Sequence, residues 1–140
     1  MSRYELLLAP AAGWAVAQGI KYAISLRKDG LQVSDLYASG GFPSSHTALM
    51  VSVTTLLGLR RGLDDALFAL AILMTALIMY DAIGVRRSSG EQAVAIKELA
   101  QKSGKTLTTR MHGAKGHTPY EVMGGIVVGV VVAFAFYLFV

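Results

Sequence analysis

ALFALAILMTALIMYDAIG, residues 66–84, contains no charged side chain before Asp81. An α-helix needs about 20 consecutive apolar residues to cross the hydrocarbon core of a membrane, and this stretch meets that need. The rest of the chain has a similar character, because 54% of its 140 residues are hydrophobic. Such a composition is typical of a small integral membrane protein and not of a soluble domain. At this length we expect a single domain, residues 1–140.

Other apolar segments predict further membrane helices. They are residues 6–26, 45–59 and 118–140. Residues 91–102 differ from them, because apolar and polar side chains alternate there at helical spacing, which predicts an amphipathic helix at the membrane surface. Residues 31–43 are mixed in character and predict a loop or a re-entrant turn. The expected fold is therefore all-α: an integral membrane helical bundle with about four transmembrane helices and one amphipathic interfacial helix.

The charges limit the kinds of partner and cofactor. The sequence has 13 Lys and Arg residues and 9 Asp and Glu residues, which give a formal net charge of +4. In so apolar a chain this surplus favours anionic lipid headgroups and phosphate over nucleic acid. The sequence has no cysteine, so disulfides, thiol chemistry and zinc held by cysteine are excluded. Nothing in the residue pattern calls for a metal or another cofactor.

The basic residues also predict an orientation in the membrane. With four spans, both termini lie on one side, together with Arg3, Arg60 and Arg61. Most of the other basic residues fall in the connections on the opposite side, and the positive-inside rule places that side in the cytoplasm. The expected localisation is the plasma (inner) membrane.

The polar residues that interrupt the apolar helices converge on the cytoplasmic end of the bundle. Each lies near the end of one predicted span or the start of the next, so antiparallel packing brings them to one membrane face. They are Lys21, Arg27, His46, Asp81, Arg86, Arg87, His117 and Glu121. Randomly placed polar residues would rarely converge in this way, and we therefore expect a functional site at this face.

His117 and Glu121 indicate the chemistry of this site. They are four residues apart at the start of a helix and therefore share one helix face. A carboxylate there accepts a hydrogen bond from one imidazole nitrogen and leaves the other nitrogen free as a nucleophile. His46, on another helix, can protonate a leaving oxygen, while Arg and Lys side chains hold the oxygens of a phosphoryl group. This set is sufficient for phosphoryl transfer through a phosphohistidine without a metal.

Three segments carry a family resemblance: GGFPSSHTA at residues 40–48, YDAIGVRRSSGEQA at residues 80–93 and GHTPYEV at residues 116–122. Together they resemble the divergent branch of the type-2 phosphatidic acid phosphatase superfamily, which is related to acid phosphatases and vanadium-dependent haloperoxidases. The resemblance implies a membrane lipid phosphatase that hydrolyses phosphatidate, phosphatidylglycerophosphate or polyprenyl diphosphate through a phosphohistidine. It also implies that His117 is the nucleophile, Glu121 its orienting carboxylate and His46 the acid.

The chain departs from the main superfamily pattern at the positions that bind phosphate. Ser45 replaces the glycine of the PSGH motif, and the two cations of the first motif, here Lys21 and Arg27, are one residue too close together. The arginine of the third motif is missing from its expected place six residues before His117. By resemblance to the divergent branch, we expect the substrate phosphate to be bound by Lys21, Arg27, Ser45, Arg86 and Arg87, with Asp81 in a supporting role.

Plainer interpretations of these residues stay open at this stage. Each histidine alone is typical of an interfacial residue, and Glu121 is typical of a carboxylate favoured by the helix dipole. A second functional class is a lipid-phosphate binding protein or flippase without hydrolysis, and Gly125-x-x-x-Gly129 would let it form a homo-oligomer. A third is a structural membrane subunit that binds no ligand, in which Arg86 and Arg87 are positive-inside anchors.

Overall fold

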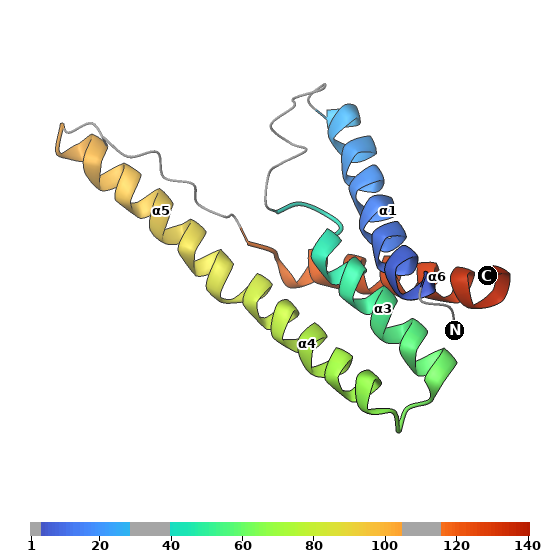
Figure 1. Cartoon of the computed structure of the whole chain (residues 1–140). Coiled ribbons are helices and arrows are strands. Elements are labelled where there is room, and N and C mark those ends of the chain that lie inside the picture. Colours follow the sequence, from blue (N-terminus) through green and yellow to red (C-terminus); the bar gives the residue numbers. More distant parts are fainter. Residues whose placement is uncertain (1–3, 29–39, 105–115) are drawn as a thin grey trace.

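The computed structural model describes residues 4–28, 40–104 and 116–140. Within these ranges all regular secondary structure is helical, which confirms the predicted all-α fold. The helices are α1 (Glu5–Lys28), α3 (Ser45–Arg61), α4 (Ala66–Ile83), α5 (Val85–Lys102) and α6 (Pro119–Phe139) (Figure 1). Most of the predicted re-entrant segment, residues 31–43, lies outside the described residues.

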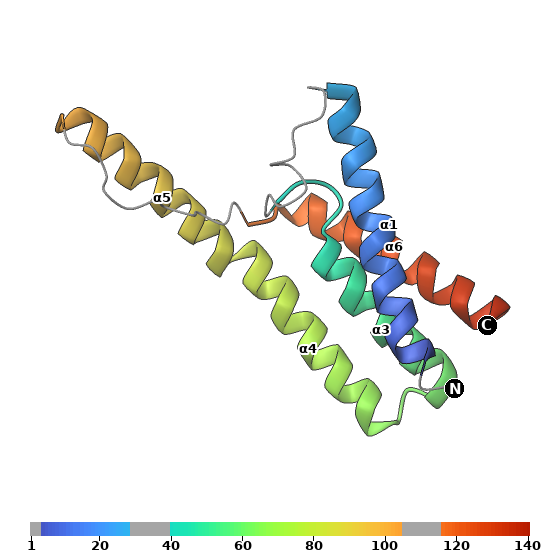
Figure 2. The ribbon, with the colours of Figure 1, turned by 45° about the horizontal axis from the view of Figure 1, so that its top comes forward.

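Helix α3 is the centre of the bundle. It packs against α1, α4 and α6, and α1 also packs against α6. Figures 1 and 2 show α6 crossing beside α3, while α1 and α4 lie on different sides of it. Among the described helices α5 packs only against α4, and it extends away from the other three (Figure 2).

A partly buried ion pair joins the start of α1 to the end of α3. Glu5 Oε2 lies 3.3 Å from Arg60 Nε, and the Arg60 guanidinium also lies over the ring of Tyr137 near the end of α6, 5.0 Å from its centroid. Helix α1 therefore begins where α3 and α6 end. The starts of α3 and α6 and the end of α4 meet at the opposite end of the bundle, beside the part of α1 that carries Lys21.

Side-chain caps set where three of the helices begin. Ser44 caps α3 and Asp65 caps α4, each by accepting a hydrogen bond from a backbone N–H of the first turn. Thr118 caps α6 in a reciprocal pair with Glu121. Such caps satisfy N–H groups that have no partner within the helix. They therefore fix the two places at which His46 and His117 enter the bundle.

Helix α5 begins earlier than the sequence predicts. The expected amphipathic helix covers residues 91–102, whereas α5 starts at Val85. The reason is that the helical hydrogen bonds continue through Gly84, whose N–H donates to the Tyr80 carbonyl and whose carbonyl accepts from the Ser88 N–H, both at 2.9 Å. Helices α4 and α5 together form one long rod (Figure 1). The interfacial placement of α5 stays a prediction.

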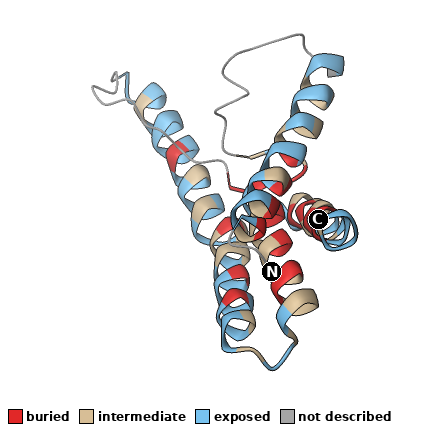
Figure 3. Ribbon diagram, turned by 45° about the vertical axis from the view of Figure 1, so that its right-hand side comes forward, coloured by how far each residue is buried: buried red, intermediate tan, exposed pale blue. Residues whose placement is uncertain are grey.

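Small side chains fill the core of the bundle, and large apolar side chains cover its outside. Figure 3 shows the buried residues where the helices face one another and the exposed residues on their outer sides. Ala9, Ala48 and Ala133 are fully buried, whereas Leu73 on α4 and Phe139 at the end of α6 are exposed. Small residues at helix interfaces are typical of membrane proteins, because they let backbones approach closely. A soluble chain rarely exposes so much contiguous apolar surface.

Two helical stretches are long and apolar enough to cross a membrane: Ala66–Lys102 and Pro119–Phe139. The first contains the predicted span at residues 66–84, and the second covers all but the two end residues of the predicted span at residues 118–140. Helix α3 has 17 residues, which is fewer than the roughly 20 that a span needs. The spans expected at α1 and α3 therefore stay predictions.

Glycines let α6 approach α3 closely. A Cβ atom at Gly125 would lie 2.8 Å from Thr47 Cβ, and one at Gly129 would lie 2.7 Å from both the Ala48 carbonyl oxygen and Val51 Cβ. Both glycines are thus used for packing inside the chain. The homo-oligomer expected through Gly125 and Gly129 stays a prediction.

Candidate active site

The side chains of His117 and Glu121 form a hydrogen-bonded pair at the start of α6. His117 Nδ1 lies 3.1 Å from Glu121 Oε2. An ionised carboxylate can only accept, so Nδ1 is the donor, and Nε2 of the neutral imidazole keeps a free lone pair. The same Glu121 oxygen accepts the Thr118 N–H at 2.9 Å, and Thr118 Oγ1 accepts the Glu121 N–H in return. This capping box holds the carboxylate in place, and the carboxylate orients the imidazole.

The residues before α6 are attached to the end of α4 and the start of α5. The His117 N–H donates to the Ala82 carbonyl at 2.9 Å. Gly116 has a φ of 63°, in the left-handed region that favours glycine, and a Cβ there would lie only 2.5 Å from Arg87 Cα. These backbone contacts fix His117 in a buried position, where it is 6% exposed.

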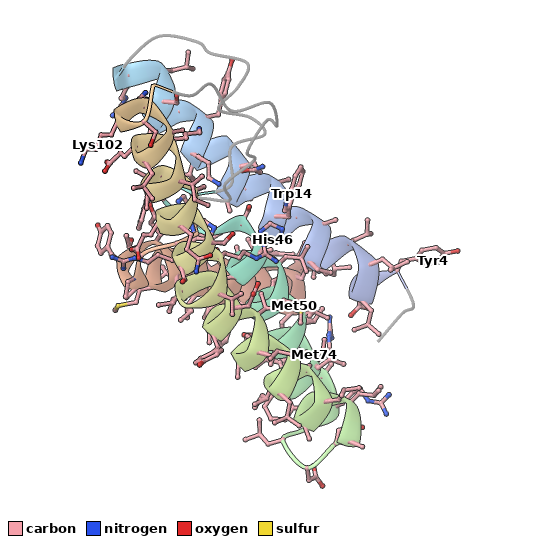
Figure 4. The ribbon with its side chains drawn as sticks, turned by 90° about the vertical axis from the view of Figure 1, so that its left-hand side faces the viewer. Tyr4, Trp14, His46, Met50, Met74 and Lys102 are labelled. Carbon is pink, nitrogen blue, oxygen red and sulfur yellow. The ribbon has the colours of Figure 1, made fainter. Side chains whose placement is uncertain are left out.

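His46 reaches the same place from the start of α3. The Ser44 N–H donates to the Glu121 carbonyl at 2.9 Å, which ties the residues before α3 to the first turn of α6. His46 follows on α3, and its side chain is exposed. Figure 4 shows it where α3 begins, in the middle of the molecule. His117 acts electrostatically on His46, so the two imidazoles share one site.

Lys21 and Arg86 supply positive charge around the two imidazoles. Both act electrostatically on His46 and on His117, although they come from α1 and α5. The stem of Lys21 lies beside Gly41, because a Cβ at Gly41 would be 3.7 Å from Lys21 Cδ. Two cations from different helices thus face one pair of histidines, an arrangement that suits an anion.

Burial lowers the pKa of His117 below its ordinary value, and the charges of Lys21 and Arg86 act in the same direction. The hydrogen bond and the negative charge of Glu121 oppose the shift without reversing it. The imidazole is therefore neutral at neutral pH, which is the state in which Nε2 can act as a nucleophile.

The adjacent residues Arg86 and Arg87 have different partners. Arg86 Nε donates to Asp81 Oδ2 at 2.5 Å, and this leaves its two Nη groups for other acceptors. Arg87 Nε donates to Glu91 Oε1 at 3.1 Å, and both of these side chains are largely exposed on α5. Asp81 thus holds Arg86 beside the histidines, whereas Arg87 is engaged on the outer part of α5.

The structure places the other two predicted phosphate-binding residues differently. Ser45 is 4% exposed and directly precedes His46. Arg27 is exposed near the end of α1, about 9 Å farther along the helix axis than Lys21. Lys21 and Arg86 therefore lie around the histidines, whereas Ser45 is buried next to His46 in the chain and Arg27 lies outside the site.

The site combines three kinds of group. Among the described residues, no set of three or more His, Asp or Glu side chains is arranged to hold a metal ion. The site offers a neutral imidazole oriented by a carboxylate, a second imidazole and two cations. Groups of these kinds can attack phosphorus, protonate a leaving oxygen and stabilise phosphoryl oxygens.

Comparison with known proteins identifies the family. The profile of the Divergent PAP2 family matches residues 3–132, a range that contains every residue of the site. The chain belongs to the divergent PAP2 family. One relative, the "uncharacterized membrane protein YuiD" of Bacillus subtilis (strain 168), is 34% identical over 141 residues, which cover 89% of this chain and 88% of that protein. No solved structure matches the chain.

Membership of the divergent PAP2 family confirms the resemblance seen in the three sequence segments. The name of the Bacillus relative describes a membrane protein, in agreement with the apolar helices α4 and α6.

Sequence reasoning did not identify the residues that attach the start of α3 to α6. The rings of Phe42 and Tyr120 stack with their centroids 4.9 Å apart, and the Phe42 ring also fills the space beside Gly124. Two signals in this divergent PAP2 chain point to these residues. An aromatic residue lies close to each histidine in the sequence, and two glycines follow one another in α6 at residues 124–125.

Proposed function

We propose that this divergent PAP2 family protein is a membrane lipid phosphatase that acts through a phosphohistidine on His117. Its substrates are lipid phosphates of the phosphatidate, phosphatidylglycerophosphate or polyprenyl diphosphate kind, and its active site faces the cytoplasm. The observation that carries the proposal is the Glu121 oxygen shared by His117 Nδ1 and the Thr118 N–H. That contact leaves His117 Nε2 free in a site that also contains His46.

In the first step, His117 Nε2 attacks the terminal phosphorus in line. A bond forms between nitrogen and phosphorus while the bond from phosphorus to the leaving oxygen breaks; that oxygen is the ester oxygen of a monoester or the bridging oxygen of a diphosphate. His46, kept protonated by the negative charge of the bound phosphate, gives its proton to that oxygen. Lys21 and Arg86 stabilise the charge on the other phosphoryl oxygens. The Glu121 carboxylate keeps its hydrogen bond to Nδ1 and stabilises the positive charge that develops on the ring.

In the second step, a water molecule attacks the phosphohistidine. His46, now neutral, takes a proton from the water as its oxygen bonds to phosphorus. The bond between His117 Nε2 and phosphorus breaks, and inorganic phosphate leaves. The neutral nucleophile and the protonated acid are both restored, so the cycle closes with groups that the chain itself supplies.

The direct assay uses the purified full-length protein in detergent with a panel of three lipid phosphates: phosphatidate, phosphatidylglycerophosphate and a polyprenyl diphosphate. We expect release of inorganic phosphate from at least one of them. A flippase that uses the same site would instead move labelled lipid phosphate across liposomes without hydrolysis. That result would overturn the phosphatase proposal and favour the second functional class.

The pH dependence tests the role of Glu121. Because Glu121 raises the pKa of His117, the Glu121→Gln variant should lower that pKa further. A nucleophilic imidazole loses activity only below its pKa, so the acidic limb of kcat/KM is expected below about pH 6.5 in the wild type and at still lower pH in the variant. We also expect kcat to fall about 10-fold to 100-fold, because the ring loses its orienting carboxylate.

The matched control for this measurement is Glu91→Gln. Glu91 is an exposed carboxylate on α5 that pairs with Arg87, and its substitution should leave the pH profile unchanged. Ionisation of the substrate affects both variants equally, so a difference between their pH profiles reflects a change in the pKa of His117. An acidic limb that moves to higher pH in Glu121→Gln would contradict the assigned role.

A further inference from the structure

We propose that Phe42 is a positioning residue for His46. Its ring packs against Tyr120 and Gly124 in the first turns of α6, and this contact holds residues 42–46 at a fixed place relative to His117. The inference rests on the proposed function, because the reaction requires two imidazoles at a defined separation.

The first observation is the aromatic contact. The rings of Phe42 and Tyr120 are stacked, with centroids 4.9 Å apart and planes inclined by 22°. Such pairs have a preferred geometry and therefore orient the groups that carry them. Tyr120 is 70% exposed, so its ring adds little to the buried core. A contact of this kind is better suited to fixing the place of Phe42 than to stabilising the fold.

The second observation is the glycine beneath the Phe42 ring. A Cβ at Gly124 would meet three atoms of that ring, and even the farthest of them would be only 3.0 Å away. Glycine weakens a helix interior relative to alanine. The close approach of the ring gives a physical reason for glycine at this position of α6.

The third observation is that the backbone is also fixed two residues after Phe42. Pro43 and Ser44 are fully buried, and the Ser44 N–H donates to the Glu121 carbonyl at 2.9 Å. The segment is thus attached to α6 by a side chain at Phe42 and by the backbone at Ser44. Both attachments are to the helix turns that directly follow His117.

These contacts connect Phe42 to the chemistry of His46. Because α6 also orients His117, a displaced Phe42 ring would move His46 relative to its partner imidazole. A displacement of about 1 Å can lower a rate by about 100-fold. Proton transfer from His46 occurs in the transition state, so misplacement should lower kcat and leave KM nearly unchanged.

The test uses the full-length protein in detergent and two matched pairs of variants. Tyr120→Leu removes the stacking partner, whereas Tyr120→Phe keeps it. Gly124→Ala displaces the Phe42 ring, whereas Gly19→Ala on α1 adds a Cβ that meets no atom of the described residues within 4 Å. We expect kcat on a lipid phosphate to fall about 10-fold to 100-fold in Tyr120→Leu and Gly124→Ala. Tyr120→Phe and Gly19→Ala should keep the wild-type kcat.

A second substrate separates positioning from a general structural role. An aryl phosphate with a stable phenolate leaving group needs no proton from His46. The rate of phenolate release in the first turnover should therefore stay near the wild-type value in all four variants. Equal losses on both substrates, a loss confined to KM, or an unchanged kcat in Tyr120→Leu and Gly124→Ala would each overturn the positioning role.

Failure of the proposed function gives a different pattern. If the wild type hydrolyses no lipid phosphate, the affinities for vanadate and inorganic phosphate are measured in the same variants. Vanadate resembles the transition state of phosphoryl transfer. Vanadate binding about 10-fold weaker in Tyr120→Leu and Gly124→Ala, with unchanged phosphate binding, would keep the positioning role and discard the phosphatase. Vanadate binding that is unchanged in these variants, or absent in the wild type, would contradict both the positioning role and the phosphatase proposal.

Discussion

Substitution of His117 with alanine is expected to reduce phosphate release from a lipid phosphate by at least about 10⁴-fold. His117 is the buried imidazole whose Nδ1 is engaged by a carboxylate, at 3.1 Å from Glu121 Oε2. The variant lacks the nitrogen that bonds to phosphorus, and His46 has no carboxylate contact among those described to orient it in the same way. The measurement is a time course of inorganic phosphate release by the purified variant over several hours.

Two controls accompany this variant. His112, the third histidine of the sequence, lies outside the described residues and outside the family segments, and His112→Ala should keep wild-type activity. Inorganic phosphate should still bind to His117→Ala, because Lys21 and Arg86 are unchanged. Residual activity above about 1% of the wild type would show that another group is the nucleophile.

Substitution of His46 with alanine is expected to produce the second largest loss, about 10²-fold to 10⁴-fold on a lipid phosphate. The alkoxide released from a phosphate monoester such as phosphatidate is a poor leaving group and needs the proton that His46 supplies. The phenolate of an aryl phosphate does not, so phosphorylation of His117 by that substrate should continue. The variant should then release one burst of phenolate and stall, because His46 is also the base for hydrolysis of the phosphohistidine.

Comparison with His117→Ala distinguishes the two histidines. His117→Ala should show no burst with either substrate, whereas His46→Ala should show one with the aryl phosphate only. Rapid mixing with detection of phenolate measures the burst directly. If both variants lose the first turnover equally on the aryl phosphate, His46 is not the acid.

The meeting of the polar residues could be predicted from the sequence, because helix ends and helix direction are encoded locally. Ser44, Asp65 and Thr118 mark helix starts with side chains that cap N–H groups. Antiparallel connections then bring His46 and His117 to one end without knowledge of their contacts. The pair His117–Glu121 follows from their spacing alone, since four residues on a helix make one face.

The different partners of Arg86 and Arg87 could not be predicted in this way. Residues 85–90 have the composition of a connection, in which both arginines could reach the site. The structure instead continues the helix through Gly84, and adjacent residues on a helix point about 100° apart. Of the two arginines, Arg86 acts electrostatically on the histidines, while Arg87 pairs with Glu91.

Tertiary contacts explain the remaining differences. The spacing of Gly125 and Gly129 predicts close helix packing, but a sequence pattern does not say whether the partner helix belongs to the same chain. Here the partner is α3. In the same way, the stacking of Phe42 on Tyr120 joins residues 78 positions apart. The sequence shows an aromatic residue near each histidine, but it does not show that these two rings pack on each other.

The central claim is that the phosphoryl group is transferred to His117 before water releases it as inorganic phosphate. Its most direct test is to mix the His46→Ala variant with a radioactive aryl phosphate, quench with base and map the labelled peptide. The account predicts that label accumulates on His117, that it is stable to base and lost in acid, and that it approaches one phosphoryl group per protein. The account would be contradicted if the wild type hydrolysed the aryl phosphate but His117 of the variant carried no label. Label on another residue would contradict it as well.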